Sequence, residues 1–195
     1  MVVKRGREEI KLLAMEARRE LNIKDDEHVE FDVDLYLEVL GKVIIPVSEL
    51  RNDLEIDSFW TNGFQELIID KECYESSSFR SRFTIAHEIG HLFLHNRSQE
   101  SYTSIEQWQD LILKNTNIRN IFEQEANSFA SIFLISDECL LEELNNLKER
   151  EEVKVYLNNQ VYTLEFISMM YSHVLSEAFH VSQRAMEIRL ENYWK

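Results

Sequence analysis

The sequence contains few residues that break or cross-link a chain: one proline, four glycines and two cysteines among 195 residues. Two cysteines, Cys73 and Cys139, exclude a disulfide-stabilised scaffold and favour a reducing compartment. No apolar run approaches the ~18 residues that a membrane span needs. The N-terminal stretch MVVKRGREEIKLL also lacks the apolar core of a signal peptide. We therefore expect a cytoplasmic protein without a membrane partner.

Basic residues are scarce as well, with 21 against 36 acidic residues and a net charge of −15. Residues 1–20 carry six basic and four acidic side chains, so the rest of the chain holds a net charge of −17. Such a surface repels phosphate backbones, and we expect no direct nucleic-acid partner. It suits a basic protein partner, and it is equally explained by solubility alone.

Apolar spacing and turn residues predict the elements of the fold. Helices are expected over 5–21, 32–41, 75–95, 104–114, 120–135, 165–179 and 183–193. A strand is expected over 42–47, and hairpins over 55–70 and 153–166. The expected class is α+β, a small and mainly antiparallel sheet packed with helices.

The stretch RFTIAHEIGHLFLH, residues 82–95, contains the strongest chemical signal. His87 and His91 lie one helical turn apart, so both imidazoles can reach one metal ion. Zinc is favoured because it accepts nitrogen ligands at about 2.0–2.1 Å. Glu88 borders this face but is offset from it, which places it to act as a general base rather than as a ligand. Burying these side chains without a metal would be costly, so the pattern favours a metal site over a pair of core histidines.

A zinc peptidase needs a third protein ligand and one position for water. His95 lies about 12 Å along the helix from His87, so we expect it to be structural or to support a ligand. In FEQEANSFA, Glu123 and Glu125 point about 200° apart, and the helical wheel does not choose between them. Asn127 lies one turn after Glu123 and can hydrogen-bond it or a ligating histidine, which favours Glu123.

The two blocks RFTIAHEIGHLFLH and EQEANSFASIFLI resemble the ImmA/IrrE family of bacterial and phage metallopeptidases. The resemblance implies a gluzincin-like zinc enzyme with His87, His91 and Glu123 as ligands and Glu88 as the catalytic base. It also implies a regulatory peptidase whose protein substrate is a basic, DNA-binding helix-turn-helix repressor or a similar regulatory protein. The sequence departs from the family pattern at Ile135-Ser136, where relatives often have Met-Pro.

We expect residues 1–150 to form the zinc metallopeptidase-like domain. Residues 151–195 are expected to form a hairpin and a short helical C-terminal lobe packed on it. The sequence at the end of this lobe has the spacing of a helix-turn-helix motif, with Ser182 as the N-cap of the second helix. Residues 166–195 carry three basic and three acidic side chains, however, so this segment lacks the excess of positive charge that DNA binding requires.

The donor for a developing oxyanion has only weak candidates, which are Tyr74, Tyr102, His95 and His173. Residues 65–70, QELIID, are the expected sheet edge for an extended substrate. The alternatives to a peptidase are a non-proteolytic, metal-containing module that binds a partner, as in toxin–antitoxin pairs, and a metal-sensing transcription regulator.

Overall fold

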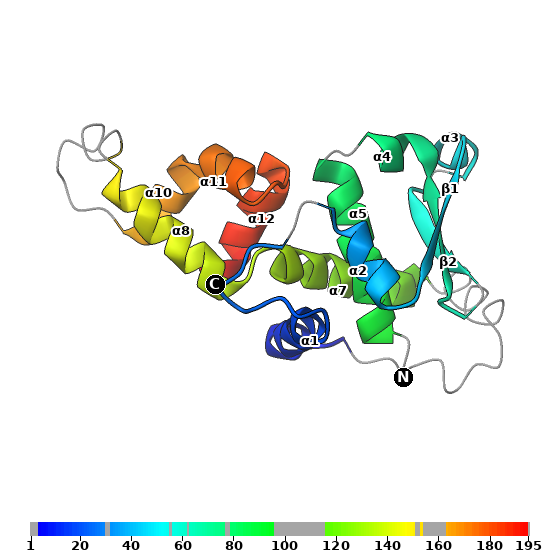
Figure 1. The fold of residues 1–195 in the computed structure, drawn as a ribbon. Helices are drawn as coiled ribbons and strands as arrows, with labels where there is room; N and C mark the ends of the chain where they lie inside the picture. The colour runs from blue at the N-terminus through cyan, green and yellow to red at the C-terminus, as the bar shows by residue number, and fades with distance from the viewer. Residues whose placement is uncertain are drawn as a thin grey trace.

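The structure is a computed structural model that describes residues 4–29, 32–54, 56–61, 63–76, 79–95, 116–150, 153 and 163–194 (Figure 1). Its strands are β1 (Val43–Val47), β2 (Ser58–Thr61) and β3 (Glu66–Asp70). Its described helices before residue 96 are α1 (Arg7–Glu20), α2 (Asp34–Val39), α3 (Leu50–Leu54), α4 (Lys71–Glu75) and α5 (Phe79–His95). Those after it are α7 (Thr116–Leu134), α8 (Asp137–Glu149), α10 (Leu164–Met170), α11 (Ser172–Ala178) and α12 (Gln183–Tyr193).

The three strands form one mixed sheet in the order β1-β3-β2. β2 and β3 are antiparallel and form the predicted hairpin, whereas β1 runs parallel to β3. The α+β class is confirmed, and the antiparallel arrangement holds for one of the two pairings. The expectation that residues 65–70 form a sheet edge is wrong. β3 is the central strand because it pairs on both sides, and its Leu67 and Ile69 are fully buried.

The link from α2 to β1 follows the predicted helix–glycine–strand pattern. Gly41 has a φ of +68°, a left-handed conformation that glycine adopts without a Cβ penalty. The Gly41 N–H donates to the carbonyl of Glu38, and the Lys42 N–H donates to that of Leu37. These bonds satisfy the last carbonyls of α2 and direct the chain into the sheet.

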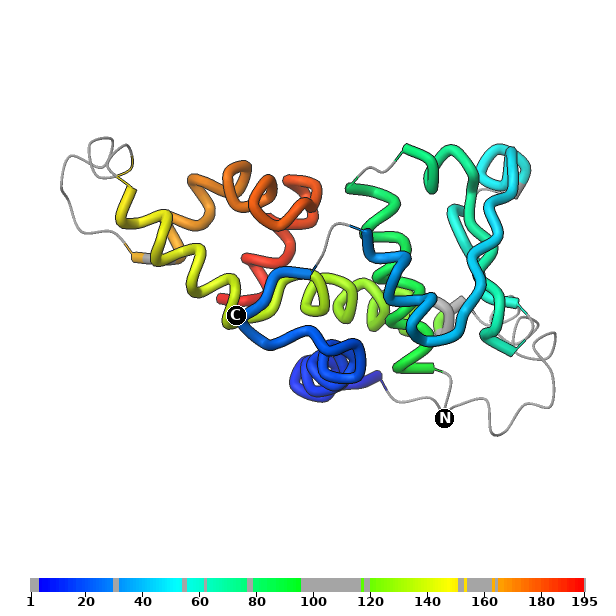
Figure 2. The backbone as a smooth tube through the Cα atoms, viewed as in Figure 1, coloured from blue at the N-terminus to red at the C-terminus, as the bar shows by residue number. Residues whose placement is uncertain are grey.

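Helix α7 lies at the centre of the molecule, where α1 and α5 pack against it (Figures 1 and 2). Its predicted apolar face is confirmed, because all five residues of that face are buried: Phe122, Ala126, Phe129, Ala130 and Phe133. The sheet, α2 and α5 lie toward one end of the molecule, and α8 and α10–α12 lie toward the other (Figure 2). This packing brings the two motif-bearing helices together.

The C-terminal part differs from its prediction in several places. Helix α8 was not expected, although its buried Leu140, Leu144 and Leu147 have helical spacing. The described ends of the expected hairpin over 153–166 are helical, since Val153 is in a helical conformation and α10 starts at Leu164. The rest of that hairpin and the expected helix over 104–114 lie outside the described residues.

The last two helices agree more closely with their prediction. The expected helix over 165–179 is divided at Tyr171 into α10 and α11. Helix α12 begins after Ser182, whose hydroxyl accepts a hydrogen bond from the Ala185 N–H as predicted. The division of the chain between residues 150 and 151 stays a prediction. Among the described helices, none is long and apolar enough to cross a membrane.

A cluster of charged side chains around the buried Arg189 attaches α12 to the start of α8. The Arg189 side chain is 1% exposed and donates from Nε and Nη2 to the carbonyl of Ile135, at 3.1 and 2.9 Å. Its Nη2 also donates to Asp137, which accepts a second hydrogen bond from Lys11 of α1. Burial alone would raise the pKa of Asp137, but these two hydrogen bonds outweigh burial and hold that pKa below its ordinary value.

The Asp137→Asn substitution is expected to lower the free energy of unfolding by about 3 kcal/mol, because it leaves the Arg189 guanidinium buried without its counter-charge. The folded pKa of Asp137 is depressed, so its stabilisation is present above the unfolded pKa and is lost as pH falls through the folded pKa. Urea unfolding of parent and variant should therefore show a difference that shrinks in acid. Glu138→Gln, at the exposed next position of α8, is the control, and an equal loss in both variants would contradict the prediction.

Candidate metal centre

The site forms at a close contact between α5 and α7. A Cβ added to Gly90 would lie 3.1 Å from Phe129 Cδ1 and 3.2 Å from the carbonyl oxygen of Ala126. Only a glycine fits this contact without displacing α7. Gly90 stands between the two predicted ligands His87 and His91, so the close approach occurs in the middle of the motif.

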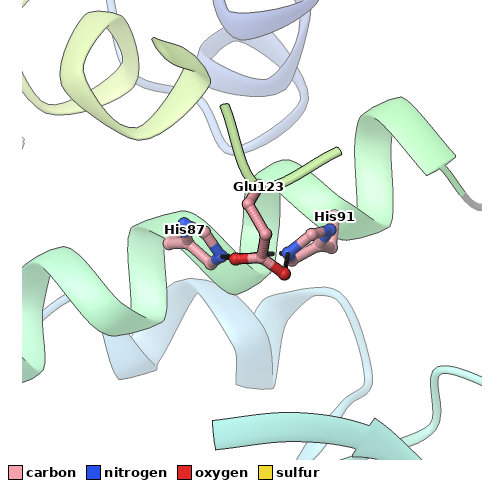
Figure 3. Close-up of side chains that lie close together, drawn as sticks. All are labelled: His87, His91 and Glu123. Carbon is pink, nitrogen blue, oxygen red and sulfur yellow. Dashed lines mark hydrogen bonds and ion pairs between the residues drawn. The ribbon is translucent and has the colours of Figure 1, made fainter. Parts of the chain in front are cut away.

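Three side chains converge there, two from α5 and one from α7 (Figure 3). The Nε2 atoms of His87 and His91 are 2.9 Å apart. The Glu123 carboxylate reaches between them, with Oε2 3.3 Å from His87 Nε2 and Oε1 3.8 Å from His91 Nε2. Within the part of the chain that the structure describes, this is the one group of at least three such side chains whose donor atoms are spaced for a metal ion.

The donor set fits a metal such as zinc. Neighbouring ligand atoms around a tetrahedral zinc ion lie about 3.3 Å apart when the bonds are about 2.0–2.1 Å long, and the separations here run from 2.9 to 3.8 Å. The side-chain oxygen of Asn127 lies 3.0 Å from His87 Nδ1. That oxygen accepts the Nδ1–H, which leaves the lone pair of His87 on Nε2, directed at the site.

The electrostatics of the site also favour a cation. Burial alone would lower the pKa of His87, but the carboxylates of Glu123 and Glu88 outweigh burial and raise that pKa. Burial lowers the pKa of His91 well below its ordinary value, so His91 is neutral at neutral pH. The negative field that favours a positive charge at His87 favours a metal cation at the same point.

Glu88 lies beside the three converging groups, and residues of strand β2 hold it in place. Its side chain is buried, and its Oε1 accepts a hydrogen bond of 2.6 Å from the Ser58 hydroxyl on β2. The indole N–H of Trp60 donates to the Glu88 backbone carbonyl at 3.0 Å. Burial raises the pKa of Glu88, although the neighbouring His87 acts in the opposite direction. A carboxylate with a raised pKa next to a metal site is a good proton acceptor.

Glu125, Tyr74 and His173 are not among the three converging groups. The carboxylate of Glu125 is fully buried and contacts His95 instead of His87 and His91. The Tyr74 hydroxyl donates to Asp34 at 2.8 Å, and burial followed by that hydrogen bond raises the pKa of Tyr74 to about 12. His173 is exposed on α11, and Tyr102 lies outside the described residues.

The comparison with protein families agrees with this geometry. Residues 52–191 match the peptidase family M78, described as the IrrE N-terminal-like domain. The chain belongs to this family. The match contains His87, Glu88, His91 and Glu123 and reaches into α12, so the resemblance inferred from the motifs is confirmed. Among curated proteins, no sequence matches the chain.

Sequence reasoning missed Ser58 and Gly90 as parts of this candidate metal centre. Ser58 lies 30 residues before Glu88, and no local pattern indicates their contact. Gly90 had a readable signal, because a glycine inside an apolar helix costs about 1 kcal/mol relative to alanine and indicates a close packing contact.

Proposed function

We propose that this protein is a zinc-dependent regulatory metallopeptidase that cleaves a helix-turn-helix repressor or a similar regulatory protein. The observation that supports this most is the convergence of His87, His91 and Glu123, with the Glu88 carboxylate held beside them. Three protein ligands leave one coordination position for water or substrate, as catalytic zinc sites require. Membership of a peptidase family supports the same reaction class.

The residues then divide the chemistry among them. His87, His91 and Glu123 would hold the zinc, and Asn127 would keep the His87 lone pair directed at it. When bound, zinc would act as a Lewis acid that activates water at neutral pH and polarises the peptide carbonyl. Glu88 takes a proton from the attacking water and later delivers it to the leaving amine. The Ser58 hydroxyl holds one Glu88 oxygen in place during both transfers.

The free edge of β2 is the proposed docking position for an extended substrate. Among the described strands, β2 pairs with β3 alone, so its other edge has backbone groups available for a further strand. Ser58 and Trp60 of β2 both contact Glu88, so a polypeptide added along this edge would pass close to the general base. This assignment replaces residues 65–70, which lie in the centre of the sheet.

The charge of the protein supports a basic substrate. A net charge of −15 attracts a DNA-binding repressor and repels DNA itself. We propose that the C-terminal helices support the fold or the substrate contact rather than bind DNA. Cys73 and Cys139 are free and buried, which suits a reducing compartment, and we propose a cytoplasmic location.

Incubation of the purified protein with a helix-turn-helix repressor from a neighbouring gene is expected to produce a discrete cleavage, located by mass spectrometry of the fragments. A strong chelator should abolish cleavage, and added zinc should restore it, because the ligands remain on the protein. Magnesium added to the chelated protein is the control, since it disfavours imidazole ligands. Cleavage that continues after complete metal removal would contradict a metal-dependent mechanism.

A further inference from the structure

A chain of buried polar groups continues from His91 away from the three converging side chains. His91 Nδ1 lies 2.9 Å from His95 Nδ1, and His95 Nε2 lies 3.2 Å from Glu125 Oε2. The side chains of His95 and Glu125 are both 0% exposed. This series of polar groups therefore crosses the interface between α5 and α7 in the interior of the protein.

The protons of this chain have one consistent arrangement. A carboxylate accepts hydrogen bonds only, so Glu125 accepts the Nε2–H of His95. A neutral imidazole carries one N–H and one lone pair, so the lone pair of His95 is on Nδ1 and accepts the Nδ1–H of His91. The lone pair of His91 is then on Nε2, the atom that faces His87 and Glu123. The buried chain thus fixes the His91 tautomer that binds a metal.

Residues 4–6, the N-terminal arm that precedes α1, hold the Glu125 end of this series of polar groups. The Arg5 backbone N–H donates to Glu125 Oε1 at 2.6 Å, and its Nη1 donates to Oε2 at 2.8 Å. Arg5 Nη2 also donates to the carbonyl of Leu94 at 2.6 Å, which joins the arm to the end of α5. Both oxygens of Glu125 are therefore held, and the carboxylate keeps its charge because these hydrogen bonds compensate for its burial.

We propose that His95 and Glu125 are positioning residues for the metal ligand His91, and that Arg5 anchors them from the N-terminal arm. This inference rests on the proposed metal site. It explains why a histidine and a carboxylate occupy the core at this point. His95 already packs on Phe122, with ring centroids 4.3 Å apart, and an apolar residue would fill the same space without the need to bury a carboxylate beside it.

The experiment measures zinc affinity by competition with a chromophoric chelator, together with the visible spectrum of the cobalt(II)-loaded full chain. His95→Leu and Glu125→Gln are expected to weaken zinc binding by about 10–100-fold, the usual loss when a supporting partner is removed. His95→Asn should retain most of the affinity, because its amide oxygen can accept the His91 Nδ1–H. The cobalt spectrum should change in His95→Leu, since the orientation of one ligand changes.

Lys4→Ala is the matched control. Lys4 donates to Gln124 at 2.7 Å, so this variant removes a neighbouring contact of the same arm without touching Glu125. It should bind zinc as the parent does, whereas Arg5→Ala should bind it more weakly. Thermal unfolding of the metal-free proteins separates loss of fold from loss of metal, and the isosteric Glu125→Gln decides the matter if His95→Leu does not fold.

The outcomes separate this inference from the proposed function. Zinc affinity equal to that of the parent in Glu125→Gln, with an unchanged cobalt spectrum, would overturn the positioning role and leave the metal site in place. A parent protein that binds no zinc would overturn the proposed function, and the positioning role with it.

Discussion

The Glu123→Ala protein is expected to contain little zinc after purification, and His87→Ala and His91→Ala are expected to behave in the same way. Each substitution removes one of three donors that lie within a few ångströms of one another. The loss of zinc affinity should be larger than the loss of about 10–100-fold that follows removal of a supporting partner. Elemental analysis of the purified variants measures it, with about one zinc ion per chain expected in the parent.

Glu125→Gln provides the comparison that tests the choice between the two glutamates. Its side chain contacts His95 and not the converging groups, so it should bind a full equivalent of zinc when the metal is saturating. Added zinc should also stabilise the parent against heat, by about 4 kcal/mol at a thousandfold excess over Kd, and Glu123→Ala should lose this effect. Full zinc content in Glu123→Ala and none in Glu125→Gln would show that the ligand is misassigned.

The local part of the site could be predicted from the sequence. The one-turn spacing of His87 and His91 determines that their side chains share a face of α5, and the structure places their Nε2 atoms 2.9 Å apart. The position of Asn127 one turn after Glu123 also predicted that Asn127 hydrogen-bonds Glu123 or a ligating histidine. Asn127 lies against His87, while Glu123 reaches between the two histidines. The shared face of His87 and His91 on α5, and that of Glu123 and Asn127 on α7, depend on helical geometry alone, which short sequence patterns report well.

The choice between Glu123 and Glu125 could not be completed from a helical wheel. Both carboxylates meet histidines of α5, Glu123 at His87 and His91 and Glu125 at His95. The wheel describes α7 by itself, whereas the outcome depends on how α5 crosses it. The close contact at Gly90 sets that crossing, and the Arg5 arm arrives from a distant part of the sequence.

The errors in the predicted sheet also arise from contacts between segments that are distant in the sequence. The β2–β3 hairpin is local, and its turn residues revealed it. The parallel pairing of β1 with β3 joins segments separated by a helix and a strand, and no local signal gives it. Without that pairing β3 appears to be an edge, so the substrate edge was assigned to the wrong strand. Helix α8 is a different case, because the spacing of Leu140, Leu144 and Leu147 was readable and was overlooked.

The Glu88→Gln protein is expected to bind zinc as the parent does and to cleave its partner at a rate reduced by about 10²–10⁴. The substitution keeps the size of the side chain, and its amide oxygen can still accept the hydrogen bond from Ser58. It removes only the group that accepts a proton from water. Glu88 is 4% exposed and is not one of the converging donors, so metal content and thermal stability should stay close to those of the parent.

Partner binding should survive in Glu88→Gln, because the edge of β2 and the acidic surface are unchanged. Co-expression of parent and variant with the candidate repressor tests both properties, with cleavage followed by mass spectrometry and association by co-purification. Loss of cleavage with retention of the complex is the result expected of a zinc peptidase whose general base has been removed. If metal-loaded Glu88→Gln instead keeps full biological activity, hydrolysis is not the function of this site. The metal would then serve a module that binds its partner without cutting it, and the observed contact between Ser58 and Glu88 would be a structural link between β2 and α5.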